Sequence, residues 1–303
     1  MGKLFLAFLV GLTVVSALFL FRDEQTSLAW PIPQIFGSFA KLAVNNWFPG
    51  GFRDLGDDSI KISAKSALLV DYESGKVIFA KNPSVRLPVA STVKIMTALI
   101  ALERGELADT FVVSQKASKV GENSMGLAEG ENLTLSELLY GMMLVSGNDA
   151  AVTIAEGIAG SEVKFVELMN EKVKELGLSD TAFINASGLD EYEREQYSSA
   201  YDMAVISHYV WDKYPKFREI TSTYNKFIEA NGYHKAFDLY NDTNLLTTYP
   251  GVKGIKPGFT WEAGLCLVTY AERDGKKLLG VILGSDDRRG EMKELLDFGF
   301  SQN

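Results

Sequence analysis

A serine and a lysine three residues apart, Ser91 and Lys94, are the side chains of this sequence best suited to chemistry. They open an apolar stretch, Thr92 to Leu102, which predicts a helix that Gly105 ends. Residues three apart share one face of a helix, so both side chains can point into one pocket. A serine hydroxyl needs an adjacent base to act as a nucleophile, and a buried lysine near another cation can lose its proton near neutral pH. We therefore expect Ser91 to be a nucleophile and Lys94 its base.

A second motif, Ser146-Gly147-Asn148, separates two apolar stretches that predict helices, Leu135–Leu144 and Asp149–Ile158. Such a polar break often does no more than satisfy the helix ends, so the motif is weak by itself. In a site with Lys94, Ser146 would relay a proton to a leaving group. Asn148 would position the lysine and a substrate amide.

The third motif, Lys256-Pro257-Gly258-Phe259-Thr260, precedes a predicted strand hairpin. Pro-Gly is also an ordinary turn signal. In a site, Lys256 would be the second cation near Lys94 and would attract a substrate carboxylate. Gly258 would let a substrate backbone approach closely. The order and spacing of the three motifs, more than any one of them, indicate an active site.

Composition excludes several other classes of protein. The net charge of −9 disfavours nucleic-acid binding, which needs lysine and arginine to neutralise phosphates. Cys266 is the only cysteine, so no intrachain disulfide is possible, and it lies in an apolar run typical of a core. The two histidines, His208 and His234, lack the spacing of metal ligands. We expect no metal and no cofactor.

The N-terminal segment predicts export. Lys3 precedes an apolar run from Leu4 to Phe21, and a membrane span needs roughly 20 residues. The run is longer than the usual core of a signal peptide, so between a cleaved signal and a retained anchor we favour the anchor. We assign residues 1–25 to this signal or anchor, 26–59 to a juxtamembrane connector and 60–303 to the functional domain. The domain would then face the periplasm or cell-wall space and contact the membrane through its N-terminal segment.

Strand patterns at both ends of the domain enclose a helix-rich middle. Residues 66–72 and 76–80 predict one hairpin, and 264–272 and 276–284 predict a second one around the Asp274-Gly275 turn. Between them, 134–144 begins with a capping-box pattern, and further helices are expected over 149–158, 162–176 and 200–211, the last bounded by Pro215. A closing helix is expected over 291–298. This order predicts an α+β fold whose antiparallel sheet is formed by both chain ends.

From about Ile60 to Phe300 the sequence resembles the serine-type D-Ala-D-Ala carboxypeptidases, the low-molecular-mass penicillin-binding proteins. The resemblance implies a β-lactamase/transpeptidase-like fold and an exported enzyme that trims the terminal D-Ala of peptidoglycan pentapeptides through an acyl-enzyme. It makes Ser91 the acylated residue, Lys94 the base, and Ser146 and Asn148 the second motif. Lys256 anchors the substrate carboxylate, and the N–H groups of Ser91 and Phe259 form the oxyanion hole. The similar stretches are Leu87–Leu99, Met143–Ala151, Asn185–Leu189, Gly254–Thr260 and Ala263–Leu267.

The sequence departs from the family pattern in three places. Pro257 stands where the family usually has threonine, and Ala186-Ser187 stand where it usually has Pro-His. Family members often continue into a small β-domain and an amphipathic helix, whereas this sequence stops soon after the predicted closing helix. The partners implied are peptidoglycan stem peptides and, as covalent inhibitors, β-lactam antibiotics.

Three alternative functions remain open from the sequence. The site could serve a D,D-endopeptidase that cuts cross-links. It could serve a β-lactamase, which needs a deacylating carboxylate; Glu191, Glu193 and Glu195 lie near a suitable loop, but no spacing selects one. Because Pro257 replaces threonine, the protein could also bind cell-wall peptides without turnover.

Overall fold

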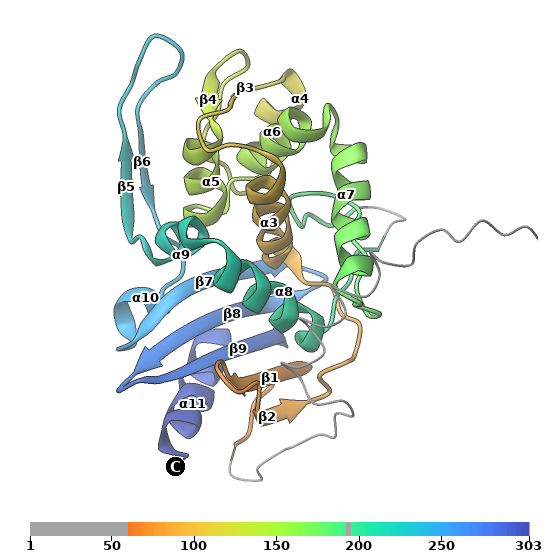
Figure 1. Ribbon diagram of the computed structural model, residues 1–303, viewed down its shortest axis with the longest axis vertical. Helices are drawn as coiled ribbons and strands as arrows, with labels where there is room; N and C mark the ends of the chain where they lie inside the picture. The colour runs from red at the N-terminus through yellow and green to blue at the C-terminus, as the bar shows by residue number, and fades with distance from the viewer. Residues whose placement is uncertain (1–59, 192–194, 303) are drawn as a thin grey trace, which may run out of the picture. The chain divides into compact units, whose positions relative to one another are not determined.

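The computed structural model describes residues 60–191 and 195–302 (Figure 1). The expected signal or anchor at 1–25 and the connector at 26–59 lie outside the described residues. Among the helices of the described part, none has the length and apolar character needed to cross a membrane.

A five-stranded antiparallel sheet lies at the base of the described part and joins the two ends of the domain. Its strands are β1 (Ser66–Asp71), β2 (Val77–Lys81), β7 (Val252–Thr260), β8 (Gly264–Arg273) and β9 (Lys276–Ser285), in the order β2-β1-β9-β8-β7. The N-terminal strand β1 pairs with the C-terminal strand β9, with Ala67 opposite Ile282. Both expected hairpins are present, and Asp274 and Gly275 take φ values of 52° and 79°, as a tight hairpin turn requires. The α+β prediction is confirmed.

A layer of helices covers one face of the sheet (Figure 1). At its centre α3 (Lys94–Arg104), entered through a 3₁₀ turn at Ala90–Val93, is buried over its first eight residues. It packs against neighbours whose bounds are α5 (Leu135–Leu144), α6 (Asn148–Ala159), α7 (Glu162–Glu175) and α8 (Ala200–Lys213). The expected helices of this layer are therefore present, and the observed ends lie no more than two residues from the expected ends. The expected capping box at Thr134 and Glu137 is also formed.

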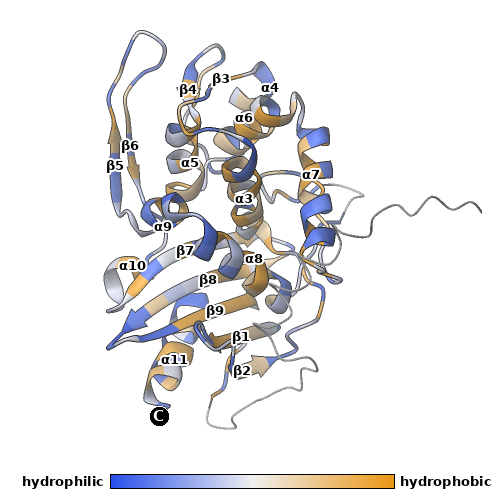
Figure 2. Ribbon diagram, viewed as in Figure 1, coloured by the Kyte–Doolittle hydropathy of each residue, from blue (hydrophilic) through white to orange (hydrophobic). Residues whose placement is uncertain are grey.

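The other face of the sheet is covered by α11 (Arg288–Ser301), which extends the expected closing helix by about one turn at each end (Figure 1). The sheet therefore has a hydrophobic core on each side. Leu68 belongs to the core beneath the helical layer, whereas its neighbour Leu69 packs with Leu295 and Leu296 of α11. Successive strand residues point to opposite faces, so strands buried on both faces read as continuous apolar runs. Figure 2 shows this hydrophobic character along β1 and β9.

Several short elements were not expected from the sequence. Pro215 does not only bound α8; it also begins α9 (Pro215–Ser222), because a proline at the first helical position loses no helical hydrogen bond. The others are two small two-stranded sheets and two single-turn helices: β3 (Thr110–Val112), α4 (Gln115–Ser118), β4 (Asn132–Thr134), β5 (Asn225–Ile228), β6 (Phe237–Tyr240) and α10 (Leu245–Thr248). They are too short to give a clear hydrophobic period.

Candidate active site

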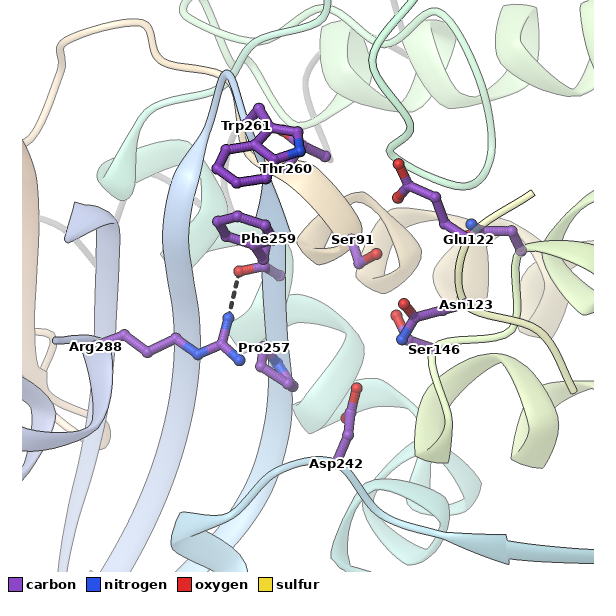
Figure 3. Close-up of a pocket in the computed structure, with 12 residues that line it drawn as sticks. Ser91, Glu122, Asn123, Ser146, Asp242, Pro257, Phe259, Thr260, Trp261 and Arg288 are labelled. Carbon is purple, nitrogen blue, oxygen red and sulfur yellow. Dashed lines mark hydrogen bonds between the residues drawn. The ribbon is translucent and has the colours of Figure 1, made fainter. Parts of the chain in front are cut away.

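A pocket of about 320 Å³ lies between the edge of the sheet and the helical layer (Figure 3). Each of the three sequence motifs contributes to its wall. The lining residues are Ser91, Glu122, Asn123, Ser146, Asn148, Asp242, Pro257, Gly258, Phe259, Thr260, Trp261 and Arg288. Lys94 and Lys256 are fully buried behind this lining.

Lys94 lies at the base of the pocket, where three groups surround its amino nitrogen. Nζ is 3.0 Å from the Ser91 hydroxyl, 2.7 Å from Asn148 Oδ1 and 2.5 Å from the carbonyl oxygen of Ser187. The last two groups only accept hydrogen bonds, and a neutral amine has two N–H donors. With both donors used in this way, the lone pair of a neutral Lys94 faces the Ser91 hydroxyl. The arrangement suits proton transfer from Ser91 to Lys94.

Two features of its surroundings favour the neutral form of Lys94. Burial lowers the pKa of Lys94 well below its usual value, and the nearby Lys256 lowers it further. Asp242, Asp149 and Glu122 oppose the shift but do not cancel it. The requirement for a second cation near Lys94, expected from the sequence, is therefore met by Lys256.

The backbone around Ser91 is tightly constrained. Ala90, just before the serine, has a φ of 47°, an unusual value for a residue with a side chain. Two glycines allow neighbouring segments to approach this turn. A Cβ on Gly188 would lie 2.2 Å from the Ala90 carbonyl oxygen, and a Cβ on Gly258 would lie 3.0 Å from the Ser91 nitrogen. The turn that carries Ser91 is thus held between a loop and strand β7.

The second motif forms the link between α5 and α6. Ser146 is buried at the pocket wall and has a φ of 60°. Asn148 begins α6 and makes contacts on two sides: Oδ1 accepts from Lys94, while Nδ2 donates to the Gly121 carbonyl at 2.9 Å. The amide group therefore fixes the base and also a loop on the far side of the pocket.

The third motif lies on β7, which is an edge strand of the sheet. Pro257 is buried and lines the pocket, and an edge strand tolerates a residue that lacks an N–H. Thr260 Oγ1 accepts from the Ala263 N–H at 3.1 Å, so this hydroxyl also closes the turn that follows β7. Phe259 and Trp261 are exposed beside the opening.

Two charged residues beside β7 were missed by sequence reasoning, as was Glu122 on the opposite wall of the pocket. Asp242 accepts from the Lys256 ammonium at 3.1 Å, and burial lowers the pKa of Lys256 despite this partner. Arg288, at the start of α11, donates to the Gly258 carbonyl (Figure 3). Neither residue belongs to a motif, and only the fold brings them to β7. Arg288 in the lining and Lys256 buried behind it therefore place two cations at one end of the pocket.

Ala186-Ser187 stand where the resembled family usually has Pro-His. In this structure both residues contact the site through backbone carbonyl oxygens. The Ala186 carbonyl accepts from Thr97 Oγ1 at 2.7 Å, and the Ser187 carbonyl accepts from Lys94. Both are main-chain oxygens, so other side chains at these positions can provide the same two contacts.

Of the carboxylates considered for deacylation, the two among the described residues, Glu191 and Glu195, lie outside the pocket lining. Glu191 accepts from Asn185 Nδ2, Glu195 does not line the pocket, and Glu193 lies outside the described residues. The pocket carboxylates are instead Glu122 and Asp242. Among residues 60–191 and 195–302, no group of three or more histidine, cysteine, aspartate or glutamate side chains could hold a metal ion.

Comparisons with known proteins identify the relatives of this chain. Residues 55–287 match the family model described as D-alanyl-D-alanine carboxypeptidase. The carboxypeptidase DacF of Bacillus subtilis is 41% identical over 247 residues, which cover 79% of this chain and 62% of DacF. The chain thus spans about three-fifths of the length of such curated relatives.

Two solved structures share the fold. The Streptomyces DD-transpeptidase has a TM-score of 0.75 and 26% identity, over 80% of this chain and 98% of that one. A penicillin-binding protein of Listeria monocytogenes, solved in its ampicillin-bound form, has a TM-score of 0.71 and 27% identity. That match covers 80% of this chain and 99% of the Listeria chain.

Proposed function

The chain belongs to the D-alanyl-D-alanine carboxypeptidase family, and on that premise we propose that it is a serine peptidase that removes the terminal D-Ala of peptidoglycan pentapeptides. The observation that carries the proposal is the position of Lys94. Its amino nitrogen is 3.0 Å from the Ser91 hydroxyl, and two acceptors use the N–H groups that a neutral amine has. A serine with such a base can form an acyl-enzyme.

Acylation would begin when the Ser91 hydroxyl gives its proton to Lys94 and its oxygen attacks the carbonyl carbon of the penultimate D-Ala. The N–H groups of Ser91 and Phe259 would stabilise the oxyanion. The C–N bond then breaks, and Ser146 passes the proton from Lys94 to the leaving D-Ala nitrogen. Water would hydrolyse the ester on Ser91 with the same base, releasing the shortened peptide.

The terminal carboxylate of the substrate would bind at the cationic end of the pocket. Lys256 is buried and paired with Asp242, whereas Arg288 lines the pocket and is partly exposed. Arg288 can therefore meet the carboxylate directly, and Lys256 would add positive potential from behind. Thr260 would contribute a hydroxyl on the same strand. This anchor would place the terminal peptide bond, rather than an internal one, beside Ser91.

The proposed function also implies which inhibitors the chain would bind and on which side of the membrane it would act. β-Lactams would acylate Ser91 as substrates do, and the chain would act on the outer side of the cytoplasmic membrane, in the periplasm or cell-wall space. The apolar N-terminal segment, as signal or anchor, would take it there.

Covalent labelling by a fluorescent penicillin tests the proposal. The wild type should be labelled and should release D-Ala from a pentapeptide ending in D-Ala-D-Ala. Ser91→Ala should lose both activities and remain folded, because a small truncation at a pocket surface rarely unfolds a domain. The control, Ser222→Ala, changes an exposed serine of α9 and should keep both. Labelling that persists in Ser91→Ala would remove Ser91 as nucleophile; labelling without D-Ala release would indicate binding without this turnover.

A further inference from the structure

One wall of the pocket is a loop, Gly121 to Leu127, that is fixed to the start of α6. The Asn148 N–H donates to the Asn123 carbonyl at 2.8 Å, in addition to the side-chain bond to Gly121. The buried Asp149 carboxylate accepts from three consecutive N–H groups of the loop, each at 2.9 Å, and from the Ser124 hydroxyl at 2.6 Å. The loop is therefore a preformed part of the site.

This loop presents Glu122 to the pocket. The residue has a φ of 61°, an unusual value for a residue with a side chain, and its side chain is exposed at the pocket wall. Figure 3 shows its carboxylate directed toward the space above Ser91. The loop bonds around it involve the backbone of its neighbours, so they hold Glu122 in place whatever the charge of its side chain.

An aromatic pair stands on the opposite wall. Phe259 and Trp261 follow Gly258 at the end of β7, with ring centroids 5.6 Å apart in an edge-to-face arrangement. Trp261 is 92% exposed, an unusual position for a large apolar side chain. In Figure 3 the opening above Ser91 lies between these rings and the Glu122 carboxylate.

The direction of β7 indicates which part of a substrate would lie there. Gly258 is level with Ser91, and Lys256 lies two residues before it. A peptide extended along this edge with its carboxylate near Lys256 and Arg288 would place its scissile carbonyl at Ser91. Its upstream residues would then run toward Trp261, three residues beyond Gly258, or about 10 Å of extended chain. The residue before D-Ala-D-Ala would reach the opening between Trp261 and Glu122.

We propose that Glu122 and Trp261 form a subsite for a free amino group on the side chain of the residue that precedes D-Ala-D-Ala. The inference rests on the proposed carboxypeptidase function and names the substrate class that the site prefers. A carboxylate pairs with an ammonium group, and the face of an indole ring attracts the same cation. Acylation of the amino group, as in a cross-linked peptide, would remove the charge and both interactions. The enzyme would then distinguish uncrosslinked from crosslinked stem peptides.

The test compares two peptides that differ only at this amino group: Nα-acetyl-L-Lys-D-Ala-D-Ala and the same peptide acetylated on both nitrogens. Both interactions are partly exposed to solvent, so we expect kcat/KM to be about three- to tenfold higher for the free amine at low salt. The ratio should fall toward one as ionic strength rises, because salt screens exposed charges. Each ratio is measured on one enzyme preparation and is therefore independent of the fraction that is folded.

Charge variants assign the preference to Glu122. Glu122→Gln should bring the ratio close to one. Glu122→Lys should favour a third peptide, in which the ε-amino group is succinylated and negative, and a loss of structure alone would not produce this reversal. The control is Glu129→Gln, which removes the same charge from an exposed position outside the pocket lining and should keep the wild-type ratio.

The outcomes separate this inference from the proposed function. Equal cleavage of the two peptides by the wild type, or an unchanged ratio in Glu122→Gln, would overturn the amino-group subsite while leaving the carboxypeptidase intact. Failure to cleave either peptide would overturn the carboxypeptidase proposal, and the subsite with it. A preference for the free amine that Glu122→Gln removes and Glu129→Gln keeps would support the subsite.

Discussion

At the residue scale, the pKa of the proposed base, Lys94, depends on charges beyond its own contacts. Lys94 owes its lowered pKa first to burial and then to Lys256, while three carboxylates oppose the shift. A base that must be neutral works above its pKa, so acylation should rise with pH through the pKa of Lys94. Under the proposed mechanism, Lys256 therefore sets part of the pH range in which Ser91 is acylated.

Lys256→Met tests this coupling. Removing the positive charge removes one cause of the lowered pKa and leaves Asp242 to raise it, so the pKa of Lys94 should increase. The acid limb of the pH profile for penicillin acylation should then move to higher pH. The control is Lys253→Met, which removes an exposed cation of the same strand and should not shift the limb. An unmoved limb in Lys256→Met would show that Lys256 does not contribute to the lowered pKa of Lys94.

Pro257 is the second residue whose effect can be measured. Threonine there would supply a hydroxyl that can donate to the substrate carboxylate beside Arg288. A hydrogen bond to a charged group contributes about 1.5–3 kcal/mol, or roughly 10- to 150-fold in kcat/KM. We expect Pro257→Thr to raise kcat/KM on a D-Ala-D-Ala peptide, and Pro250→Thr, at an exposed turn, to leave it unchanged. An unchanged or lower value for Pro257→Thr would mean that Arg288 compensates or that proline suits another substrate.

Sequence reasoning at this scale found the residues that local order brings together. Ser91 and Lys94 share a helical face, and Ser146 and Asn148 lie at one break between helices, so their proximity follows from short-range geometry. Asp242, Arg288 and Glu122 could not be found in this way. They lie on separate segments, and only tertiary packing brings them to one pocket. Their roles, like those of the motif residues, stay predictions until they are tested by mutation.

At the element scale, the long helices and the two large hairpins could be predicted because their hydrophobic periods extend over several turns or strand pairs. The β3–β4 and β5–β6 strand pairs could not be predicted, since strands of three or four residues give no clear hydrophobic period. The loop that carries Glu122 has no regular structure at all. Its conformation comes from the bonds to the start of α6, which no local pattern reveals.

Asp149→Asn tests that dependence. An amide has only one acceptor oxygen, and its NH₂ group would face N–H donors that the carboxylate now accepts. Leaving buried donors unsatisfied costs about 1–3 kcal/mol each, so the free energy of unfolding in urea should fall by at least about 2 kcal/mol. Penicillin acylation should also slow, because the pocket wall loosens.

The matched control is Asp109→Asn, whose carboxylate accepts from one exposed N–H. It should change the free energy of unfolding by less than about 1 kcal/mol, as most surface substitutions do. A wild-type acylation rate in Asp149→Asn would show that the loop holds its shape without these bonds.

At the scale of the whole described domain, the sheet depends on two cores. Leu295 of α11 is fully buried against the face that the helical layer does not cover. Leu295→Ala should lower the free energy of unfolding by about 2–5 kcal/mol, through lost burial and the cavity left behind. Val163→Ala, at a position 71% exposed on α7, should stay within about 0.5 kcal/mol of the wild type. Equal stability of the two variants would mean that α11 contributes little to the fold.

The pairing of β1 with β9 also has a consequence for when the pocket forms. Ala67 and Ile282 are opposite each other in the sheet, yet nearly the whole domain separates them along the chain. During synthesis, the β1–β2 hairpin cannot pair with β9 until the β8–β9 hairpin has been made. Non-local strand pairing of this kind is slow. Arg288 reaches the pocket only after that step. If the chain crosses a membrane in an unfolded state, the complete pocket would therefore form only after β8, β9 and Arg288 had crossed.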